Sequence, residues 1–233
     1  MLNTHITKKS LVHCISIAGT NILIFGDECS KQVDEIKCEL INYRYFIHSA
    51  TENDKSTIPS FAENLNIALE SAPSIRPNKS IRDGIQSKDV ALMIYTSGTT
   101  GLPKAANVNH AKIMYYGAVF STGANITPND RIYCALPLYH TVGGTLSVGM
   151  MMMGGATLVI ARSFSASKFW KEVNYYNCTV IQYIGELCRY LLAVTPKPDF
   201  DQKNNVRVAV GKFCLLINLQ AHLSKDVYFK ITR

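Results

Sequence analysis

Residues 91–104 read ALMIYTSGTTGLPK, a short apolar run followed at once by small and hydroxyl-bearing residues. The apolar run, Ala91 to Tyr95, has the length and composition of a buried strand. The six residues after it, 96–101, supply four hydroxyl groups and two glycines, and Lys104 follows. Glycine lets the backbone approach a ligand, hydroxyls add donors, and lysine adds positive charge. The stretch therefore favours a loop that binds a polyphosphate, which offers several acceptor oxygens and negative charge.

Two familiar phosphate-binding patterns do not describe this loop. The residue five positions after Gly98 is Pro103, so the pattern G-x-x-x-x-G-K-[ST] is absent, and no G-x-G-x-x-G occurs. Taken alone, the composition is also that of a surface turn rich in serine, threonine and glycine. Both interpretations are open at this point.

On either side of this loop, helical and extended patterns alternate along the chain. Apolar runs of strand length lie at 21–25, 43–47, 91–95, 131–136, 156–160, 179–183 and 206–210. Helical patterns lie at 10–18, 33–40, 60–72 and 110–122, and further helices are expected to begin near Ser165 and Gly185. Ser60 and Glu63 have the spacing of a capping box, and loop-rich connections are expected at about 49–60 and 73–89. Helices interleaved with strands predict an α/β fold with a largely parallel sheet, because parallel neighbours require a crossover connection.

Composition and charge exclude several classes of protein. The 233 residues are 47% hydrophobic and 18% charged, which is enough for a packed core and unlike a disordered chain. The net charge is +7, but the basic residues are dispersed and Lys8–Lys9 is an isolated pair, so we expect no nucleic-acid partner. The seven cysteines include no C-x-x-C pair, which argues against a disulfide framework and a zinc cluster.

One stretch, Thr141 to Ala161, carries no formal charge and is long enough to imitate a membrane span. The pair Gly154–Gly155 divides it into a methionine-rich half and a β-branched half. We therefore expect a buried helix, a turn and a buried strand. The methionines Met150 to Met153 are expected to fill the core rather than to line an acyl pocket.

The string YTSGTTGLPKAA, at 95–106, resembles the phosphate-binding signature of the adenylate-forming (AMP-binding) superfamily, which includes acyl-CoA synthetases, luciferases and peptide-synthetase adenylation domains. The string LPLYH at 136–140 is similar to the superfamily's second nucleotide- and acyl-site segment. The strings at 164–170 and 178–192, and the opening LVHC at 11–14 and LIFG at 23–26, resemble the fatty acid transport proteins, also called very-long-chain acyl-CoA synthetases. The resemblance runs from about Leu2 to Gly211.

This resemblance implies a fold and a reaction. The fold would be an incomplete N-terminal domain of an adenylate-forming enzyme, with a largely parallel sheet flanked by helices. The enzyme would be a long-chain fatty acid–CoA ligase, which converts a long- or very-long-chain fatty acid to acyl-CoA through an acyl-adenylate and is coupled to fatty acid uptake. ATP and Mg²⁺ would serve the first step, and CoA would be the co-substrate of the second.

The resemblance also implies site residues. Those that match the phosphate-binding signature, and would hold the β- and γ-phosphates, are Thr96, Ser97, Gly98, Thr99, Thr100, Gly101 and Lys104. Tyr139 and His140 would border the acyl and adenylate site, although a histidine in this apolar segment can also be a core residue. His110 is interpreted as structural. Glu186 is open between a site role and packing at a helix start, where the helix dipole favours a carboxylate.

The superfamily's later signatures do not occur after Gly211, including the magnesium-site glutamate and the catalytic lysine. We therefore assign no catalytic residue and no metal ligand. Residues 1–211 are expected to form a partial AMP-binding domain and 212–233 a tail unrelated to the family, for which a retained intron or alternative 3′ end is one hypothesis. An incomplete domain leaves apolar faces and strand edges uncovered, so we expect the chain alone to fold poorly or to need a partner, and to be inactive.

The expected partners are fatty acid, ATP and CoA, and the resemblance adds a membrane surface and association with a full-length homologue. Localisation by resemblance is at the endoplasmic reticulum, peroxisome or plasma membrane, with the site facing the cytosol and no anchor visible in this chain. Two alternatives stay open: a truncated, non-catalytic nucleotide- or fatty-acid-binding or regulatory fragment, and a gene-model fragment without a role of its own.

Overall fold

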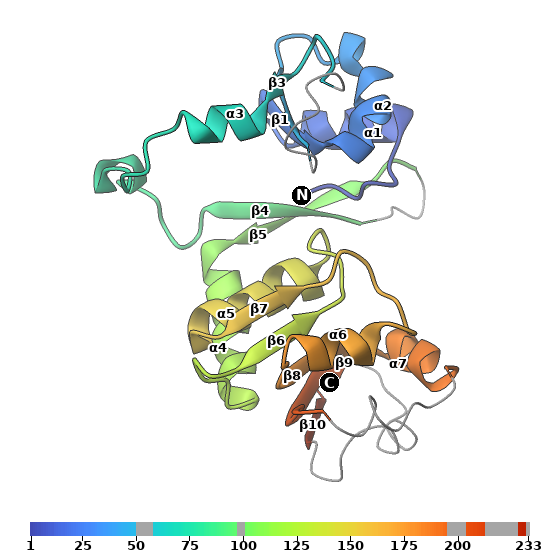
Figure 1. Ribbon diagram of the computed structural model, residues 1–233. Coiled ribbons are helices and arrows are strands. Elements are labelled where there is room, and N and C mark those ends of the chain that lie inside the picture. The colour runs from blue at the N-terminus through green and yellow to red at the C-terminus, as the bar shows by residue number, and fades with distance from the viewer. Residues whose placement is uncertain (50–57, 97–100, 195–203, 213–227, 232–233) are drawn as a thin grey trace. The chain divides into compact units, whose positions relative to one another are not determined.

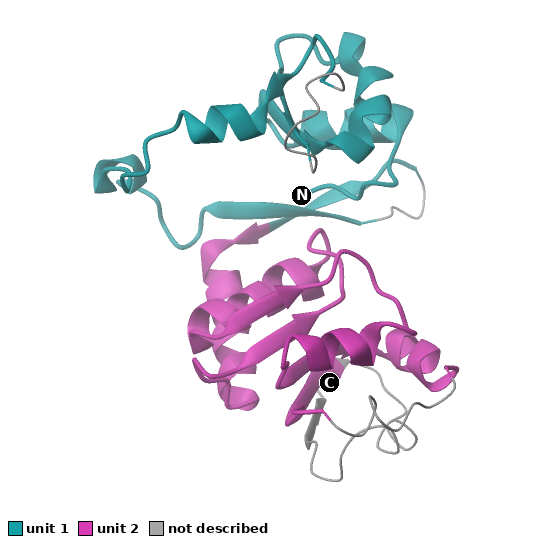
Figure 2. Cartoon of the chain, in the orientation of Figure 1, with its two compact units in different colours: residues 1–107 teal, residues 108–233 magenta. Residues whose placement is uncertain are grey.

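The computed structural model describes residues 1–49, 58–96, 101–194, 204–212 and 228–231 (Figure 1). The chain divides into two compact units, residues 1–107 and 108–233 (Figure 2). Each unit has hydrophobic clusters of its own, one in the first unit and two in the second. This division was not predicted from the sequence.

The first unit contains a three-stranded parallel sheet in the order β1-β2-β3. Its strands are β1 (Ile22–Gly26), β2 (Arg44–His48) and β3 (Glu63–Asn64). The connections contain α1 (Lys8–Ile17), which precedes β1, and η1 (Asp27–Cys29), α2 (Ser30–Asp34) and η2 (Lys37–Glu39), which join β1 to β2. The expected strands at 21–25 and 43–47 are thus confirmed within one residue, as is their parallel pairing.

The core of the first unit contains one face of this sheet and the apolar sides of its helices. Leu11 and Ile15 of α1 are buried there with Val33, as their helical spacing predicts. Phe25 and Ile47, which are partners in the β1–β2 register, contribute from the strands. Alternation along β1 leaves Ile24 59% exposed on the other face, as expected for a sheet covered on one side.

The helix expected at 60–72 begins later than predicted. Glu63 and Asn64 form β3, and α3 spans Leu65–Glu70. The Asn64 side chain accepts hydrogen bonds from the backbone N–H groups of Asn66 and Ile67, at 2.8 and 3.2 Å, so Asn64 is the N-cap. The predicted capping box at Ser60 and Glu63 is therefore wrong, because Glu63 pairs with Phe46 of β2 instead.

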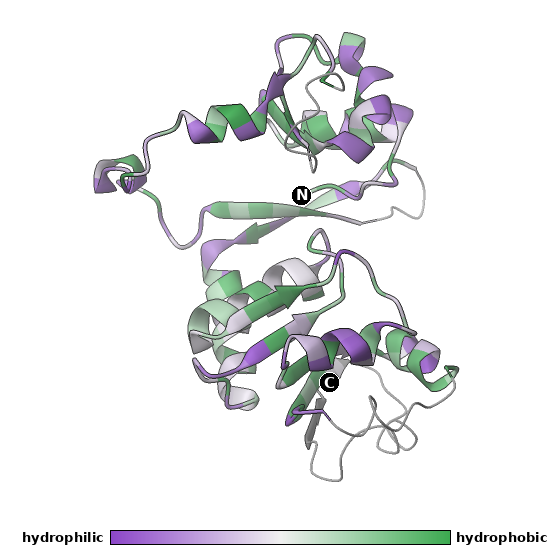
Figure 3. Cartoon of the chain, in the orientation of Figure 1, coloured by the Kyte–Doolittle hydropathy of each residue, from purple (hydrophilic) through white to green (hydrophobic). Residues whose placement is uncertain are grey.

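The stretch that carries the loop forms a separate two-stranded sheet. β4 (Val90–Thr96) enters the loop and β5 (Lys104–Asn109) leaves it, and the short helix η4 (Lys79–Arg82) lies in the connection before β4. Figure 3 shows β4 as hydrophobic along most of its length, whereas β5 carries hydrophilic residues. The strand at 91–95 is confirmed, and β5 was missed because KAANVN has no apolar run.

The second unit contains a five-stranded sheet in the order β10-β9-β8-β6-β7, and all its pairings are parallel. The strands are β6 (Arg131–Cys134), β7 (Thr157–Ile160), β8 (Val180–Ile184), β9 (Val208–Lys212) and β10 (Tyr228–Ile231). The helices are α4 (His110–Gly123), the π-helix η5 (Thr141–Ser147), α5 (Val148–Gly154), α6 (Phe169–Tyr175) and α7 (Gly185–Leu192). The predicted α/β class with a parallel sheet is confirmed.

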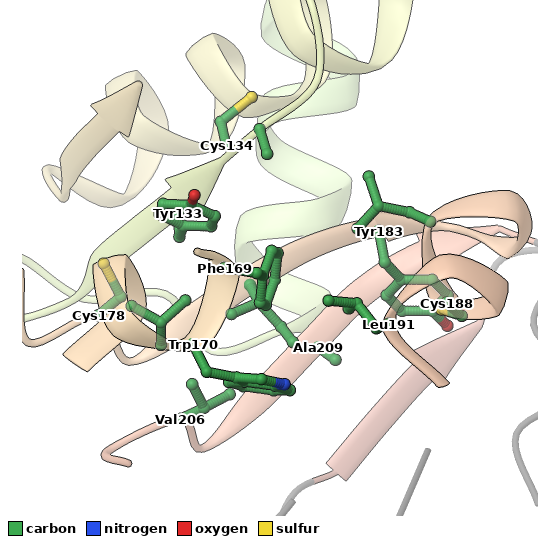
Figure 4. Packing of buried hydrophobic residues seen from close by; sticks show 14 of the residues in the cluster. Tyr133, Cys134, Phe169, Trp170, Cys178, Tyr183, Cys188, Leu191, Val206 and Ala209 are labelled. Atoms are coloured by element: carbon green, nitrogen blue, oxygen red, sulfur yellow. The ribbon is translucent and has the colours of Figure 1, made fainter. Parts of the chain in front are cut away.

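Helices cover both faces of this sheet. Strand residues that contact α6 and α7 alternate with those that contact α4, η5 and α5, as the two-residue period of a strand requires. The first set is Tyr133, Ile181, Tyr183 and Ala209, and the second is Ile132, Val180, Val208 and Val210. Figure 4 shows the first cluster, in which the rings of Phe169 and Trp170 meet edge to face at 5.0 Å.

A polar network joins three strands at the amino edge of the sheet. Asp130, Thr179 and Arg207 directly precede β6, β8 and β9. Asp130 is 3% exposed and accepts hydrogen bonds from Thr179 Oγ1 at 2.6 Å and from the Arg207 guanidinium. Burial raises the pKa of Asp130, but the bonds from Arg207, Thr179 and the Thr127 backbone outweigh it and hold the pKa well below its usual range.

Helices α4 and α5 cross at two glycines. A Cβ placed on Gly117 would lie 2.5 Å from the Gly149 carbonyl oxygen, and one placed on Gly149 would lie 2.9 Å from Gly117 Cα. Any side chain at either position would therefore separate the two helix backbones. This close crossing explains why Gly117 and Gly149 have no side chain.

The helix, turn and strand expected for Thr141 to Ala161 are confirmed, and only the full burial of the strand is wrong. η5 and α5 are followed by Gly155, with φ +67°, and then by β7. β7 is an edge strand, so it is not fully buried. Met150 is completely buried, but Met152 and Met153 are 63% and 47% exposed, so the core role is wrong for these two. Within the described ranges, no helix combines the length and apolar character needed to cross a bilayer.

Candidate functional site

The two ends of the proposed phosphate-binding loop meet at its base. Thr96 is the last residue of β4 and Lys104 is the first of β5, and Thr96 Oγ1 donates to the Lys104 carbonyl oxygen at 3.4 Å. Both side chains are exposed. Ser97, Gly98, Thr99 and Thr100 lie outside the described residues. The structure thus brings together Thr96 and Lys104, two of the predicted site residues.

Two residues of the predicted phosphate-binding set, Gly101 and Lys104, are described by the structure. Gly101 has φ +153°, a backbone conformation that residues with a side chain rarely adopt. Lys104 forms no ion pair with any carboxylate of the described residues, so nothing in that part of the chain neutralises its ammonium group. An exposed lysine without a carboxylate partner can bind a phosphate oxygen, so the predicted role of Lys104 is compatible with its surroundings.

Helix α1 contacts the strands on both sides of this loop. Tyr95, next to Thr96, donates its hydroxyl proton to the Cys14 carbonyl oxygen at 2.7 Å. His13 Nε2 lies 3.0 Å from the carbonyl oxygen of Pro103, next to Lys104. Burial raises the pKa of Tyr95, so its hydroxyl stays a donor. Neither contact was predictable from sequence, because each joins residues that are far apart in the chain, 13 to 103 and 14 to 95.

The second candidate segment follows β6 in the other unit. Tyr139 is half-buried and His140 is exposed, with their ring centroids 4.9 Å apart. The alternative of a core histidine at position 140 is therefore wrong. The His140 N–H donates to the Pro137 carbonyl at 3.1 Å, and its own carbonyl accepts from the Gly144 N–H at 2.8 Å. His140 is the N-cap of the π-helix η5.

Local packing fixes the turn that holds Tyr139 and His140. A Cβ on Gly143 would lie 2.7 Å from the Leu136 carbonyl oxygen and would also collide with that of Pro137. Leu136 itself is buried. Glycine at 143 therefore allows the π-helix to fold back onto the turn. Short π-helical segments are rare and occur frequently at functional sites.

A buried polar network holds the π-helix against the sheet. Gln182 of β8 is fully buried, and its Nε2 donates to the Val142 carbonyl oxygen at 3.1 Å. The Ser147 hydroxyl bonds the Gln182 side-chain oxygen and lies 3.3 Å from the Cys134 sulfur. Burial raises the pKa of the Cys134 thiol, which remains protonated. The network links the segment directly after His140 to β6 and β8, and this role of Gln182 was not predicted.

Two further residues considered in the sequence analysis, Glu186 and His110, lie at helix starts with local hydrogen bonds. Glu186 is exposed at the start of α7 and accepts a hydrogen bond from Arg189 Nε at 3.1 Å; the bond from Arg189 lowers the pKa of the Glu186 carboxyl. His110 is the first residue of α4, where the Asn109 side chain caps the helix by accepting from the Lys112 N–H at 2.8 Å. Neither contact involves a candidate site residue.

No metal ligand is assigned. Among the residues that the structure describes, no three His, Cys, Asp or Glu side chains gather as a metal ion would require. The described ends of the loop contribute a hydroxyl and an ammonium group, which suit phosphate oxygens rather than a cation. Mg²⁺ is therefore treated only as part of the substrate Mg-ATP.

A comparison with models of protein families identifies the family of this chain. The family model described as "AMP-binding enzyme" matches residues 1–228. The chain belongs to this family. As an AMP-binding enzyme family member, it has the parallel α/β fold that the resemblance implied.

Relatives of this AMP-binding family member are fatty acid transport proteins. It is 37% identical over 211 residues to "Long-chain fatty acid transport protein 1" of Rattus norvegicus, covering 91% of this chain and 32% of that protein. It is 36% identical over 214 residues to "Long-chain fatty acid transport protein 2" of the same organism, covering 90% and 33%. The chain thus spans about a third of the length of these relatives. The resemblance to this branch is confirmed.

Solved structures of AMP-binding enzymes share the fold. The inhibitor-bound N-terminal domain of FACL13 from Mycobacterium tuberculosis has a TM-score of 0.76 at 20% identity, covering 100% of this chain and 55% of that chain. ATP-bound MatB from Rhodopseudomonas palustris has a TM-score of 0.75 at 19% identity, covering 99% and 44%. The fold is that of the N-terminal domains of adenylate-forming enzymes. The ligand-binding roles of the seven loop residues, and of Tyr139 and His140, stay predictions.

Proposed function

We propose that this chain carries the triphosphate-binding loop and part of the acyl site of an ATP-dependent ligase, which activates long- or very-long-chain fatty acids to acyl-CoA and is coupled to fatty acid uptake. The observation that carries the proposal is the base of the loop. There, Thr96 and Lys104 close a strand–loop–strand unit whose sequence matches the family's phosphate-binding signature. The fatty acid class is supported by the names of the relatives.

The proposed reaction has two displacements. A carboxylate oxygen of the fatty acid attacks the α-phosphorus of Mg-ATP, forming acyl-adenylate and releasing pyrophosphate. The CoA sulfur then attacks the acyl carbonyl carbon, and AMP leaves as its bond to that carbon breaks. The first step requires negative charge to be held on the departing phosphates, so fixed donors and a cation near them lower the barrier.

The residues of this chain act by binding and orienting. The Lys104 ammonium group would attract the β- and γ-phosphates, and the Thr96 hydroxyl and the backbone at Gly101 would orient them. Tyr139 and His140 would border the acyl-adenylate, with the ring of Tyr139 offering an apolar face and that of His140 a hydrogen-bonding edge. We also propose membrane association, with the site facing the cytosol, at the endoplasmic reticulum, peroxisome or plasma membrane.

The test is nucleotide binding by the purified chain together with palmitate-dependent ATP–pyrophosphate exchange. The variant Lys104→Ala removes the charge from the loop, and Lys88→Ala, an exposed lysine before the opposite end of β4, is the matched control. We expect Lys104→Ala to weaken Mg-ATP binding by about 10-fold or more, as for a lost charge-assisted bond. Lys88→Ala should leave the affinity unchanged.

Three outcomes separate the alternatives. Equal Mg-ATP affinity in Lys104→Ala and the original chain would overturn the role of the loop. Specific ATP binding without pyrophosphate exchange would instead support a non-catalytic nucleotide- or fatty-acid-binding or regulatory chain. Exchange by a full-length homologue that changes from its own rate when this chain is added would support association with such a partner.

A further inference from the structure

Two residues of α1 contact the residues at the base of the phosphate-binding loop. Cys14 bonds Tyr95 on the β4 side, at 2.7 Å, and His13 contacts Pro103 on the β5 side, at 3.0 Å. Two consecutive residues of one helix thus contact both ends of the loop base, each one position away from Thr96 or Lys104. All of these residues belong to the same unit.

We propose that His13 is a positioning residue for the nucleotide's terminal phosphates, and that it acts with Cys14 by fixing Thr96 and Lys104 at the base of the loop. The inference rests on the proposed function and adds to it a residue that touches no substrate atom. His13 lies in the LVHC string, which resembles the fatty acid transport protein branch. This string has no assigned role in nucleotide binding.

The chemistry of the two atoms in the His13 contact determines which of them donates the hydrogen bond. A carbonyl oxygen can only accept, so His13 Nε2 carries the proton and donates it to Pro103. Proline has no backbone N–H of its own and contributes only this carbonyl to the strand base. The bond from His13 therefore gives the Pro103 carbonyl a partner and orients the peptide plane that leads into Lys104.

The Cys14 contact has an equally specific origin. Cys14 is among the last four residues of α1, whose carbonyl groups have no partner within the helix. The Tyr95 hydroxyl supplies one. A helix end thereby gains a hydrogen bond, and the residue before Thr96 is held at a fixed distance from α1.

Helix α1 is itself a rigid support. Leu11, Cys14 and Ile15 are 8%, 0% and 2% exposed, and Leu11 and Ile15 belong to the core that includes Phe25 and Ile47. Because protein interiors are close-packed, α1 cannot shift without disturbing this core. Its hydrogen bonds to Tyr95 and Pro103 therefore transmit the rigidity of the core to the loop base, and binding residues that are held in place beforehand lose less entropy when a ligand binds.

The test compares Mg-ATP with AMP, because only the former has the β- and γ-phosphates. In His13→Ala we expect Mg-ATP affinity to fall by about three- to ten-fold, which corresponds to one hydrogen bond. AMP affinity should stay within about two-fold, which is a few tenths of a kcal/mol. His13→Gln, whose Nε2 can donate from a similar position, should recover most of the loss. The control is His5→Ala, since the His5 side chain is exposed in the same unit.

A merely structural role would move both affinities together with the melting temperature. An unchanged ratio of Mg-ATP to AMP affinity in His13→Ala, alongside a clear loss in Lys104→Ala, would overturn the inference and leave the proposed function intact. No effect in either variant would reject the proposed function itself. If His13→Ala does not fold, Tyr95→Phe removes the other contact, and an unchanged ratio in that variant would also overturn the inference.

Discussion

Arg207 donates two hydrogen bonds to the carboxylate of Asp130, from Nε at 2.8 Å and from Nη2 at 2.6 Å, and two more to the backbone carbonyls of Ala124 and Asn125. The carboxylate is almost fully buried, while the arginine side chain is 39% exposed. One guanidinium therefore joins the start of β9 to the residue before β6 and to the end of α4.

Loss of this guanidinium should destabilise the protein. In Arg207→Ala the Asp130 charge stays buried without its main partner, and the free energy of unfolding should fall by about 3 kcal/mol. Arg189→Ala is the control, because its ion pair with Glu186 is exposed on both sides and its loss should leave stability nearly unchanged. Urea unfolding curves measure both. Equal losses in the two variants would contradict the structural role of the Asp130–Arg207 pair.

Stability should also fall in acid because of Asp130. Its pKa in the folded protein lies below the ordinary value of 3.8, so the unfolded chain binds the proton first as the pH drops. The contribution of Asp130 is thus fully present above about pH 5 and is lost progressively below about pH 4. Urea unfolding at a series of pH values should show this loss, and Asp130→Asn should remove part of the slope. A slope identical to that of the original chain would argue against the low pKa.

The helix crossing at Gly117 and Gly149 should tolerate no side chain. Gly149→Ala places a methyl group against Gly117 Cα and the Ile113 carbonyl, both at 2.9 Å, and should cost about 1–3 kcal/mol or more. Gly123→Ala, in α4 with nothing within 4 Å of its Cβ, is the matched control and should be neutral or slightly stabilising. Thermal unfolding distinguishes them. A neutral Gly149→Ala would mean that the two helices can move apart freely.

The Gln182–Ser147 network should show energetic coupling. Gln182→Leu leaves the Val142 carbonyl and the Ser147 hydroxyl short of a partner, and we expect a loss of about 1–3 kcal/mol. Adding Ser147→Ala should cost less in that background than alone, and a double-mutant cycle measures the difference. Thr145→Val is the control, because the buried Thr145 hydroxyl has no hydrogen-bond partner among the described residues. A cycle without coupling would mean that the two side chains act independently.

The regular elements of the fold were largely predictable from local pattern. β6, β8 and α4 have apolar residues at the expected period, and their bounds agree within about two residues with the segments 131–136, 179–183 and 110–122. β5 could not be found in this way, because a strand in a two-stranded sheet needs a partner more than an apolar face. The helix after residue 60 was misplaced because Asn64 caps it and Glu63 pairs with β2.

The candidate site was predictable only in part. The loop and the segment with Tyr139 and His140 were visible as strings of consecutive residues. His13 and Gln182 were not, since each acts through a residue distant in sequence, at separations of 90 and up to 40 positions. The exposure of Met152 and Met153 was also missed, because four consecutive methionines on a helix cannot all face one side.

The common direction of the strands has a practical consequence for β6. Asp130 directly precedes its first residue and the turn that contains Tyr139 lies beyond its last, so the ion pair and this turn are at opposite ends of one strand, which is about 13 Å long for four residues. Substitutions that strengthen the Asp130–Arg207 contact and raise the melting temperature should therefore leave the turn that contains Tyr139 unchanged. Equally, substitutions in the turn should leave the Asp130–Arg207 ion pair intact.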